Sequence, residues 1–406
     1  MRLFIIPMAT LLILTALSTD SQAVSTCKTA TADDWPKREC LEPKTPSTAA
    51  KPEIKAPDFS YPCREERCDL TALMNRVQAC ALIVVQDGNT VLRQFAGPDG
   101  AANCARYKRQ HRYGLASVTK SLTSILFGML WSDPAYGSPI DLDMPARDAL
   151  AGSQIRYTGP GTVRDLLQMS SRMWWGEATG QPKVKIVLDD NGRPKPGYRT
   201  MREAAQALLD RTAFKAWKSF NYSGFDTLMI GFLVESRLKA VPNLQTKTLP
   251  AALEYFVWKA ADTGRRADWK ADFERHSPGF CCLRADADDV AAVGQWILER
   301  FEEGGSPDVS PIARWLRASA TDTVDSGQGC QFGTFRQRLR YGYQWWVLSG
   351  DGNGFTARGV GGQFIHVMPD FDTVIVQLGS WGEGWPSDKE CESYFVHRRL
   401  AEYLGR

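Results

Sequence analysis

Residue patterns typical of β-strands occur near both ends of this chain, and helix-like patterns fill the long interval between them. The turn 86–89, with Asp-Gly-Asn between two apolar runs, is a strong hairpin signal. The distribution predicts an α+β fold: an antiparallel sheet built from both ends, flanked by helices and carrying an inserted, mostly helical domain. The predicted strands are 79–85, 90–95, 341–348, 355–358, 364–368 and 373–378, and the predicted helices are 69–78, 121–131, 161–170, 200–218, 225–238, 250–262, 286–302 and 389–404.

We place one folded unit at 61–406. Its α/β part is predicted at about 61–133 and 336–406, and its helical part at about 134–335. A chain of 406 residues is long enough for a large core of this kind. The net charge of +3 gives no reason to expect nucleic acid as a partner.

The first 23 residues have the pattern of a secretory signal peptide. An apolar run over 3–17 follows Arg2, and Ser21-x-Ala23 places small residues where signal peptidase cuts. The run is shorter than the ~20 apolar residues that a membrane-spanning helix needs, so an uncleaved anchor is the weaker interpretation. We expect cleavage after Ala23, export to the periplasm or the extracellular space, and no stable membrane span afterwards. Residues 24–60, rich in proline, lysine, threonine and alanine, are predicted to be an extended spacer.

Ten cysteines follow the predicted cleavage site, and an even number in an exported chain favours disulfides. Cys281 and Cys282 are not expected to bond to each other, because neighbouring cysteines form a strained ring. We expect one of them to pair with Cys330 and the other with a different cysteine; the alternative is that both are small buried residues. No histidine lies at metal-ligand spacing from a cysteine, so neither a metal nor a cofactor is predicted.

Ser117-Val118-Thr119-Lys120 stands where a strand-like approach meets the apolar helix 121–131. Residues three apart lie on one helical face, with Cβ atoms about 5–6 Å apart, so a serine and a lysine at this spacing can touch. A serine nucleophile needs such a contact with an amine base, and the field of a helix N-terminus favours an ionised serine oxygen. The alternative is a capping serine followed by a solvated lysine.

Two later stretches add to this pair. Tyr222 precedes an apolar helix on a loop from which a tyrosine can exchange a proton with a serine when a cation lies nearby. Arg358 is followed by Gly359-Val360-Gly361-Gly362-Gln363, a stretch that leads into a predicted strand. Glycines ahead of a strand let the backbone approach a ligand closely. A backbone N–H there, together with that of Ser117, is predicted to form an oxyanion hole.

Taken in this order, the three stretches resemble the serine hydrolase family that contains class C β-lactamases, D,D-carboxypeptidases and related esterases and amide hydrolases. The resemblance covers about residues 75–405 and implies a β-lactamase/transpeptidase-like fold. It implies that Ser117 is the nucleophile of an acyl-enzyme, that Lys120 activates it, and that Tyr222 is the general acid/base. Gln363 would give the second oxyanion-hole N–H, in the Gly361-Gly362-Gln363 strand entry. Further matching landmarks are 115–124, 140–145, 162–171, 283–294, 341–346 and 359–369.

Two positions depart from the penicillin-recognising branches of that family. Those branches carry an asparagine two residues after the tyrosine, where this chain has Gly224. They also carry Lys-Thr-Gly on the final strand, where this chain has Val360-Gly361-Gly362 and no cation. Both differences favour the esterase and 6-aminohexanoate-oligomer hydrolase branch, with a small-molecule ester or amide as substrate.

Two other functions stay open at this point. One is a peptidoglycan D,D-peptidase or β-lactamase. The other is a binding or sensing protein of the same fold with weak activity, against which the intact serine, lysine and tyrosine argue. Trp174, Trp175, Trp381 and Trp385 occupy loop-like stretches and are predicted to line an aromatic cleft for an apolar acyl or amide group. The alternative for these tryptophans is core packing.

Overall fold

The computed structural model describes residues 58–63, 66–96, 104, 112–173, 183–242, 244, 246–304, 309–350, 354–382 and 386–405. The predicted signal peptide and nearly all of the predicted spacer lie outside these residues, so both remain predictions. Trp174, Trp175 and Trp385 lie outside them as well.

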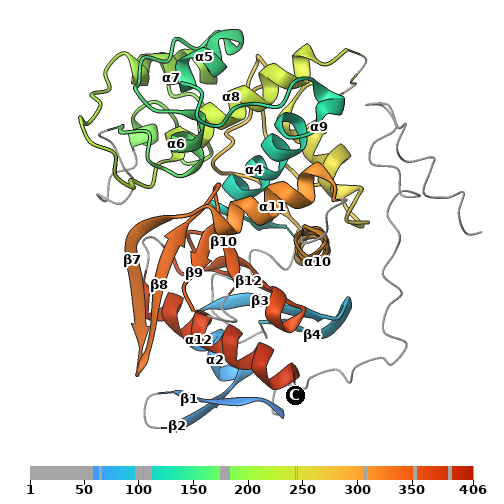
Figure 1. The fold of residues 1–406 in the computed structure, drawn as a ribbon. Helices are drawn as coiled ribbons and strands as arrows, with labels where there is room; N and C mark the ends of the chain where they lie inside the picture. Colours follow the sequence, from blue (N-terminus) through green and yellow to red (C-terminus); the bar gives the residue numbers. More distant parts are fainter. Residues whose placement is uncertain are drawn as a thin grey trace, which may run out of the picture.

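An eight-stranded antiparallel sheet forms the centre of the structure (Figure 1). The strand order is β4-β3-β12-β11-β10-β9-β8-β7, so the two ends of the chain meet where β3 pairs with β12. This arrangement confirms the predicted sheet. The strands are β3 (Ala79–Gln86), β4 (Asn89–Phe95), β7 (Val324–Phe332), β8 (Phe335–Tyr341), β9 (Trp346–Leu348), β10 (Phe355–Gly359), β11 (Gln363–Met368) and β12 (Thr373–Gly379).

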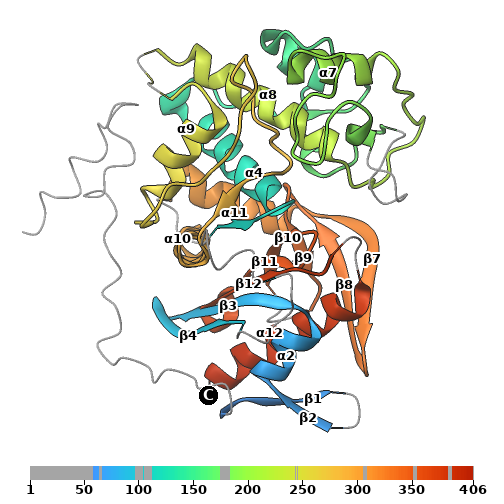
Figure 2. The same ribbon diagram turned by 180° about the vertical axis from the view of Figure 1, so that it is seen from behind.

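Both faces of the central strands are buried, which explains why these strands are nearly continuous apolar runs. Along β3, Ile83 and Val85 face one core, while Leu82 and Val84 face another. Helix α10 (Ala287–Glu303) covers the first face, and α2 (Leu70–Arg76) and α12 (Ser387–Leu404) cover the second (Figures 1 and 2). A small hairpin of β1 (Ser60–Cys63) and β2 (Glu66–Asp69) lies beyond α2 and α12 (Figure 1).

The two predicted turns have the backbone that their residues favour. Asp87 and Gly88, with φ of 47° and 75°, link β3 to β4, as expected for a two-residue hairpin loop. A short 3-10 turn, Pro369–Phe371, followed by Asp372 at φ 45°, links β11 to β12. The register of the central strands is therefore set by local turn chemistry.

The inserted part is mostly helical and packs above the sheet (Figure 1). Helix α4 (Val118–Trp131) is buried on every side from residue 118 to residue 130 and contacts three other helices of the inserted part. Predicted helix 200–218 ends early, and 250–262 divides into an α-helix and a π-turn. The other elements are η5 (Pro134–Tyr136), α5 (Ala146–Ala149), η6 (Leu150–Ser153), α6 (Val163–Leu167), η8 (Lys183–Ile186), α7 (Met201–Leu209), α8 (Gly224–Ala240), α9 (Leu249–Leu253), η9 (Glu254–Trp258) and α11 (Pro311–Thr321).

The second group of strands in the sheet begins earlier in the chain than predicted. Strand β7 lies inside the segment 134–335 that we expected to be helical, and β7 and β8 form one edge of the sheet. The predicted strand 341–348 is shorter, because Gln344 turns away at φ 67° and its N–H donates to Leu167 O at 3.0 Å. None of the helices in the described part of the chain is both long and apolar enough to cross a membrane.

Eight of the cysteines lie in the described residues, and the structure pairs them in four disulfides. The bonds join Cys63 to Cys68, Cys80 to Cys104, Cys281 to Cys282 and Cys330 to Cys391. The prediction that one of Cys281 and Cys282 pairs with Cys330 is therefore wrong. Cys330 on β7 faces Cys391 on α12, which packs against that strand, and the adjacent pair closes on itself.

Candidate active site

Ser117 lies at the N-terminal end of α4, directly after a short strand. Strand β5 (Tyr113–Gly114) pairs with β6 (Arg284–Ala285), and Leu115 N donates to Leu283 O at 2.8 Å. Ala116 then adopts φ 46°, a conformation that a residue with a Cβ keeps only where its surroundings impose it. Ser117 is the N-cap residue of α4, but its side chain makes no capping hydrogen bond. The sharp turn thus leaves the serine hydroxyl available for other contacts.

Lys120 follows one helical turn later, and its side chain is only 2% exposed. Lys120 Nζ lies 3.0 Å from Ser117 Oγ and 3.2 Å from the carbonyl oxygen of Phe280. The serine–lysine contact predicted from the spacing is present in the structure. The alternative of a solvated lysine is wrong, because α4 is buried on the face that carries Lys120.

Helix α4 is fixed in place by short polar side chains that would be unusual in an apolar core. Ser121 Oγ donates to Gln344 O at 2.7 Å, Thr123 Oγ1 to Gly279 O at 2.7 Å, and Ser124 Oγ to Tyr343 O at 2.6 Å. Each bond satisfies a buried hydroxyl and ties the helix to a loop beside it. The position of the Ser117–Lys120 pair is therefore set by several elements at once.

Tyr222 approaches Lys120 from the loop before α8. Lys120 Nζ lies 4.9 Å from the centroid of the Tyr222 ring, close enough for contact with the ring face. Asn221 holds the loop: its N–H donates to Met169 O at 2.7 Å and its Nδ2 to Met173 O at 2.9 Å. The three residues predicted to carry the chemistry, Ser117, Lys120 and Tyr222, are thus brought together from the start of α4 and the loop before α8.

An arginine that sequence reasoning did not select lies behind Tyr222. The rings of Tyr222 and Trp346 are 5.4 Å apart, and the guanidinium carbon of Arg358 lies 3.7 Å from the Trp346 centroid. Arg358 is buried and pairs with the buried carboxylate of Glu390. Burial alone would lower the pKa of Arg358, but the Glu390 charge, with smaller contributions from Tyr394 and Tyr222, raises it. A buried ion pair between Arg358 and Glu390 therefore lies behind Tyr222 and Trp346. The only sequence signal for Arg358 is its place just before the glycine run.

The glycine-rich turn 360–362 joins β10 to β11 next to the nucleophile. Gly359 pairs with Gln363 across the turn, and a Cβ on Gly359 would lie 3.1 Å from Ser117 N. Gly361 and Gly362 have φ of 90° and 86°, which favours glycine at both positions. The Gln363 side chain is directed elsewhere, since its Nε2 donates to Gly379 O at 2.9 Å. The turn thus approaches the Ser117 amide with its main chain.

The predicted aromatic cleft is only partly within the described residues. Trp381 is 6% exposed and packs under the glycine turn, where a Cβ on Gly362 would lie 2.4 Å from its Nε1. For this tryptophan the core alternative is correct. Nothing in the described residues tests the placement predicted for Trp174, Trp175 and Trp385.

One group of side chains in the described residues has donor atoms close enough together to hold a metal ion. Cys63, Glu66 and Cys68 place these atoms within 4.8 Å of one another. The two sulfurs are bonded to each other, and a metal-binding cysteine must be a thiolate. This group therefore does not fit a metal while the disulfide is intact.

The chain resembles known hydrolases in sequence and in fold. The family model described as Beta-lactamase matches residues 69–392. The 6-aminohexanoate-dimer hydrolase of Paenarthrobacter ureafaciens is 26% identical over 358 residues, covering 83% of this chain and 81% of that protein.

Two solved structures share the fold. A putative 6-aminohexanoate-dimer hydrolase from Bacillus anthracis has a TM-score of 0.65 at 19% identity, covering 88% of each chain. A penicillin binding protein from Bacillus halodurans has a TM-score of 0.55 at 16% identity, covering 80% of this chain and 98% of that one. Both structures confirm the fold that the sequence resemblance implied.

Proposed function

Because this chain belongs to the Beta-lactamase family of serine hydrolases, we propose that it cleaves an ester or an amide through an acyl-enzyme on Ser117. One observation carries the proposal: Lys120 Nζ, buried, lies 3.0 Å from Ser117 Oγ and 4.9 Å from the ring of Tyr222. A nucleophile within hydrogen-bond reach of a base, with a third group beside the base, is the arrangement that activates a serine.

The proposed reaction has two halves. Lys120 takes the proton as Ser117 Oγ attacks the carbonyl carbon, and Tyr222 delivers a proton to the leaving alcohol or amine. Water then attacks the acyl-enzyme and gives a proton back through the same groups, which releases the acid and restores the serine. The N–H groups of Ser117 and Gln363 would bind the oxyanion in both halves; the close approach of Gly359 to Ser117 N supports this pairing.

The substrate class that we propose is a small ester or amide without the recognition groups of β-lactams. Gly224 begins α8 where an asparagine would bind a substrate amide, and Val360, 48% exposed, stands in the turn where a lysine would bind a carboxylate. The names of two relatives, as 6-aminohexanoate-dimer hydrolases, are consistent with amide cleavage. We therefore expect turnover of p-nitrophenyl esters and short linear amides, and slow or no turnover of nitrocefin. Nitrocefin hydrolysis at the rate of a true β-lactamase would favour the D,D-peptidase or β-lactamase alternative instead.

The direct test is Ser117→Ala, which removes the nucleophilic hydroxyl group and very little packing volume. We expect loss of p-nitrophenyl ester hydrolysis and of fluorophosphonate labelling, with an unchanged melting temperature. Intact-mass analysis should find the fluorophosphonate adduct of the unmodified protein on Ser117. Turnover by a clean Ser117→Ala preparation would contradict the proposal, and binding of substrate without an adduct in the unmodified protein would favour a binding or sensing role.

We also propose that the protein is exported after removal of residues 1–23. The supporting observation is the apolar run that ends before Ser21-x-Ala23. Expression of the full sequence in a bacterial host should give a mature protein that begins at Val24. A product that retains Met1 in the cytoplasm would contradict export.

A further inference from the structure

The disulfide between Cys281 and Cys282 lies between two main-chain carbonyls that contact the active site. On one side, the oxygen of Phe280 is 3.2 Å from Lys120 Nζ. On the other, the oxygen of Leu283 accepts from Leu115 N at 2.8 Å, two residues before Ser117. The pair of cysteines is the whole of the connection between these two contacts. Any change in its backbone therefore reaches both the base and the approach to the nucleophile.

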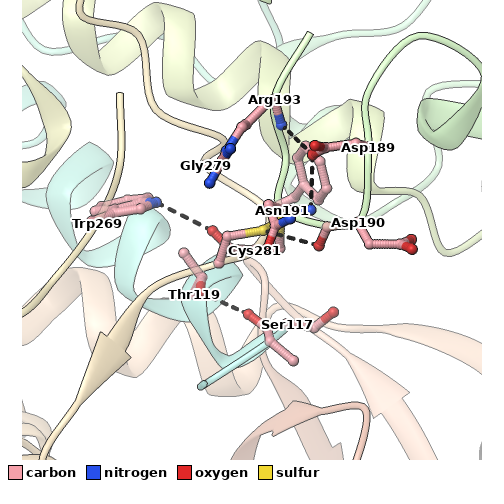
Figure 3. The surroundings of a disulfide bond; sticks show 12 residues. Ser117, Thr119, Asp189, Asp190, Asn191, Arg193, Trp269, Gly279 and Cys281 are labelled. Atoms are coloured by element: carbon pink, nitrogen blue, oxygen red, sulfur yellow. Dashed lines mark hydrogen bonds between the residues drawn. A yellow bond between two sulfur atoms is a disulfide. The ribbon is translucent and has the colours of Figure 1, made fainter. Parts of the chain in front are cut away.

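The loop around the disulfide is packed from the opposite side as well. Figure 3 shows Ser117 and Thr119 on one side of the bond and the residues 189–193 on the other. A Cβ on Gly192 would lie 3.2 Å from Cys282 Sγ, so that turn sits directly on the sulfur. Trp269 Nε1 donates to Cys281 O at 3.2 Å (Figure 3). The disulfide thus lies between the turn 189–193 and the start of α4 (Figure 3).

The backbone of this segment is one that an unconstrained chain rarely adopts. Cys282 has φ 77°, in the left-handed region that favours glycine. A bond between adjacent side chains closes a small ring through the main chain and removes most alternative conformations of both residues. Without it, the segment 280–283 would regain backbone freedom that costs about 1–2 kcal/mol per residue to remove.

We propose that the Cys281–Cys282 disulfide is a positioning element that holds Lys120 and Ser117 in register for acyl transfer. The inference rests on the proposed function of Ser117. While the disulfide is closed, the Phe280 carbonyl orients the amine of Lys120. A dithiol reductant gives two electrons to the bond, each sulfur gains a proton, and the dithiol becomes a disulfide; the loop then relaxes. Misplacing a catalytic group by about 1 Å can cost about 100-fold in rate.

The test compares two double variants that each remove one disulfide. Cys281→Ala/Cys282→Ala removes the bond beside α4. The matched control, Cys63→Ala/Cys68→Ala, removes another short-range disulfide from the hairpin β1–β2, on the far side of the sheet from α4 (Figure 1). Measurements are the acylation rate and KM for a p-nitrophenyl ester, the rate of fluorophosphonate labelling, and the melting temperature.

We expect the acylation and labelling rates of Cys281→Ala/Cys282→Ala to fall about 10- to 100-fold, with KM within about threefold. The control variant should keep its rates and lose only melting temperature. Treating the unmodified protein with a dithiol should lower its rates to those of the first variant, and reoxidation should restore them. The same treatment should leave the rates of Cys281→Ala/Cys282→Ala unchanged.

Each failure has a different signature. If the untreated protein forms no fluorophosphonate adduct on Ser117, the proposed function is wrong. If the adduct forms and its rate is the same with and without the Cys281–Cys282 bond, the positioning role is wrong. Should Cys281→Ala/Cys282→Ala fail to fold, the unmodified protein is titrated with the dithiol, and the opened disulfides are identified by thiol alkylation and peptide mass. Rates that fall as Cys281–Cys282 opens while the other three disulfides stay closed support the positioning role. Rates that do not fall when this bond opens overturn it.

Discussion

Gly359 ends β10 against the peptide that carries the nucleophile, and replacing it with alanine tests that contact. The added Cβ would lie 2.5 Å from Leu115 O and 3.1 Å from Ser117 N. Ordinary van der Waals contact begins at 3.4 Å, so the shortfall at Leu115 O is 0.9 Å. Both neighbours are main-chain atoms, and no flexible side chain can move aside. Either the end of β10 or the approach to Ser117 must shift by nearly this amount.

The shift separates the two proposed oxyanion donors, because Gly359 pairs with Gln363 across the turn. A displacement of about 1 Å lowers the rate about 100-fold, which is about 2.7 kcal/mol in activation free energy. Removing one oxyanion-hole donor outright costs about 10²–10³ in kcat. We therefore expect Gly359→Ala to lose at least about 100-fold in kcat, with a much smaller change in KM.

The assay is steady-state hydrolysis of a p-nitrophenyl ester, with active sites counted by fluorophosphonate labelling at completion. Gly264→Ala is the matched control, because the same methyl group there would lie 3.7 Å from its nearest neighbour, Asp289 Oδ1. The control should keep its kcat. If Gly359→Ala folds, labels fully and keeps kcat within about threefold, the turn does not take part in catalysis and the reasoning is refuted.

Two further changes test the surroundings of the site. Arg358→Met should destabilise the fold by about 3–5 kcal/mol in urea unfolding, because it removes the cation that pairs with the buried Glu390 carboxylate. Arg358→Met/Glu390→Met should recover most of the loss, and a single variant that costs under about 1 kcal/mol would contradict this. His397 is buried, and burial, with a smaller effect of His366, lowers its pKa well below the usual value. The unfolded chain therefore takes up this proton first as the pH falls, so the stability from His397 is present above about pH 6.5 and is lost below it. Urea unfolding between about pH 8 and pH 5 should show a shallower decline for His397→Gln than for the unmodified protein; equal slopes would show that His397 contributes nothing.

The central strands were predictable because turn chemistry and apolar runs agree there. The edge strand β7 and its neighbour β8 were not, because both are rich in polar or charged residues, and Gly327 and Gly329 interrupt β7. Helix α11, over Pro311–Thr321, was missed too, since no separate helix was predicted between 302 and 341. Such elements are stabilised by the neighbours that they pack against, which no local pattern shows.

The contacts in the site also divide into local ones, which could be predicted, and long-range ones, which could not. Spacing within one helix was enough to predict that Ser117 and Lys120 touch, because the geometry is local. Tyr222 is remote in sequence, and only the resemblance to a family placed it beside them. The contact of Phe280 O with Lys120 depends on a loop that folds over α4. The contact of Arg358 with the Trp346 ring depends on β10 lying beside that tryptophan. The bond between Cys281 and Cys282 was not predicted, because neighbouring cysteines rarely bond to each other. Its formation here depends on the conformation of the surrounding loop, which no local pattern shows.

The pairing of β3 with β12 also determines when the chain can fold. Val84 pairs with Ile375 in the middle of the sheet, so this contact closes a loop that contains nearly all of the folded chain. Contacts between such distant residues form slowly, because the entropy of closing the loop is lost before the pairing stabilises it. A ribosome-bound chain that has not yet reached residue 373 lacks β12, the second partner of β3, and leaves an open, apolar strand edge. The sheet that carries the glycine turn can therefore be completed only after synthesis has passed β12.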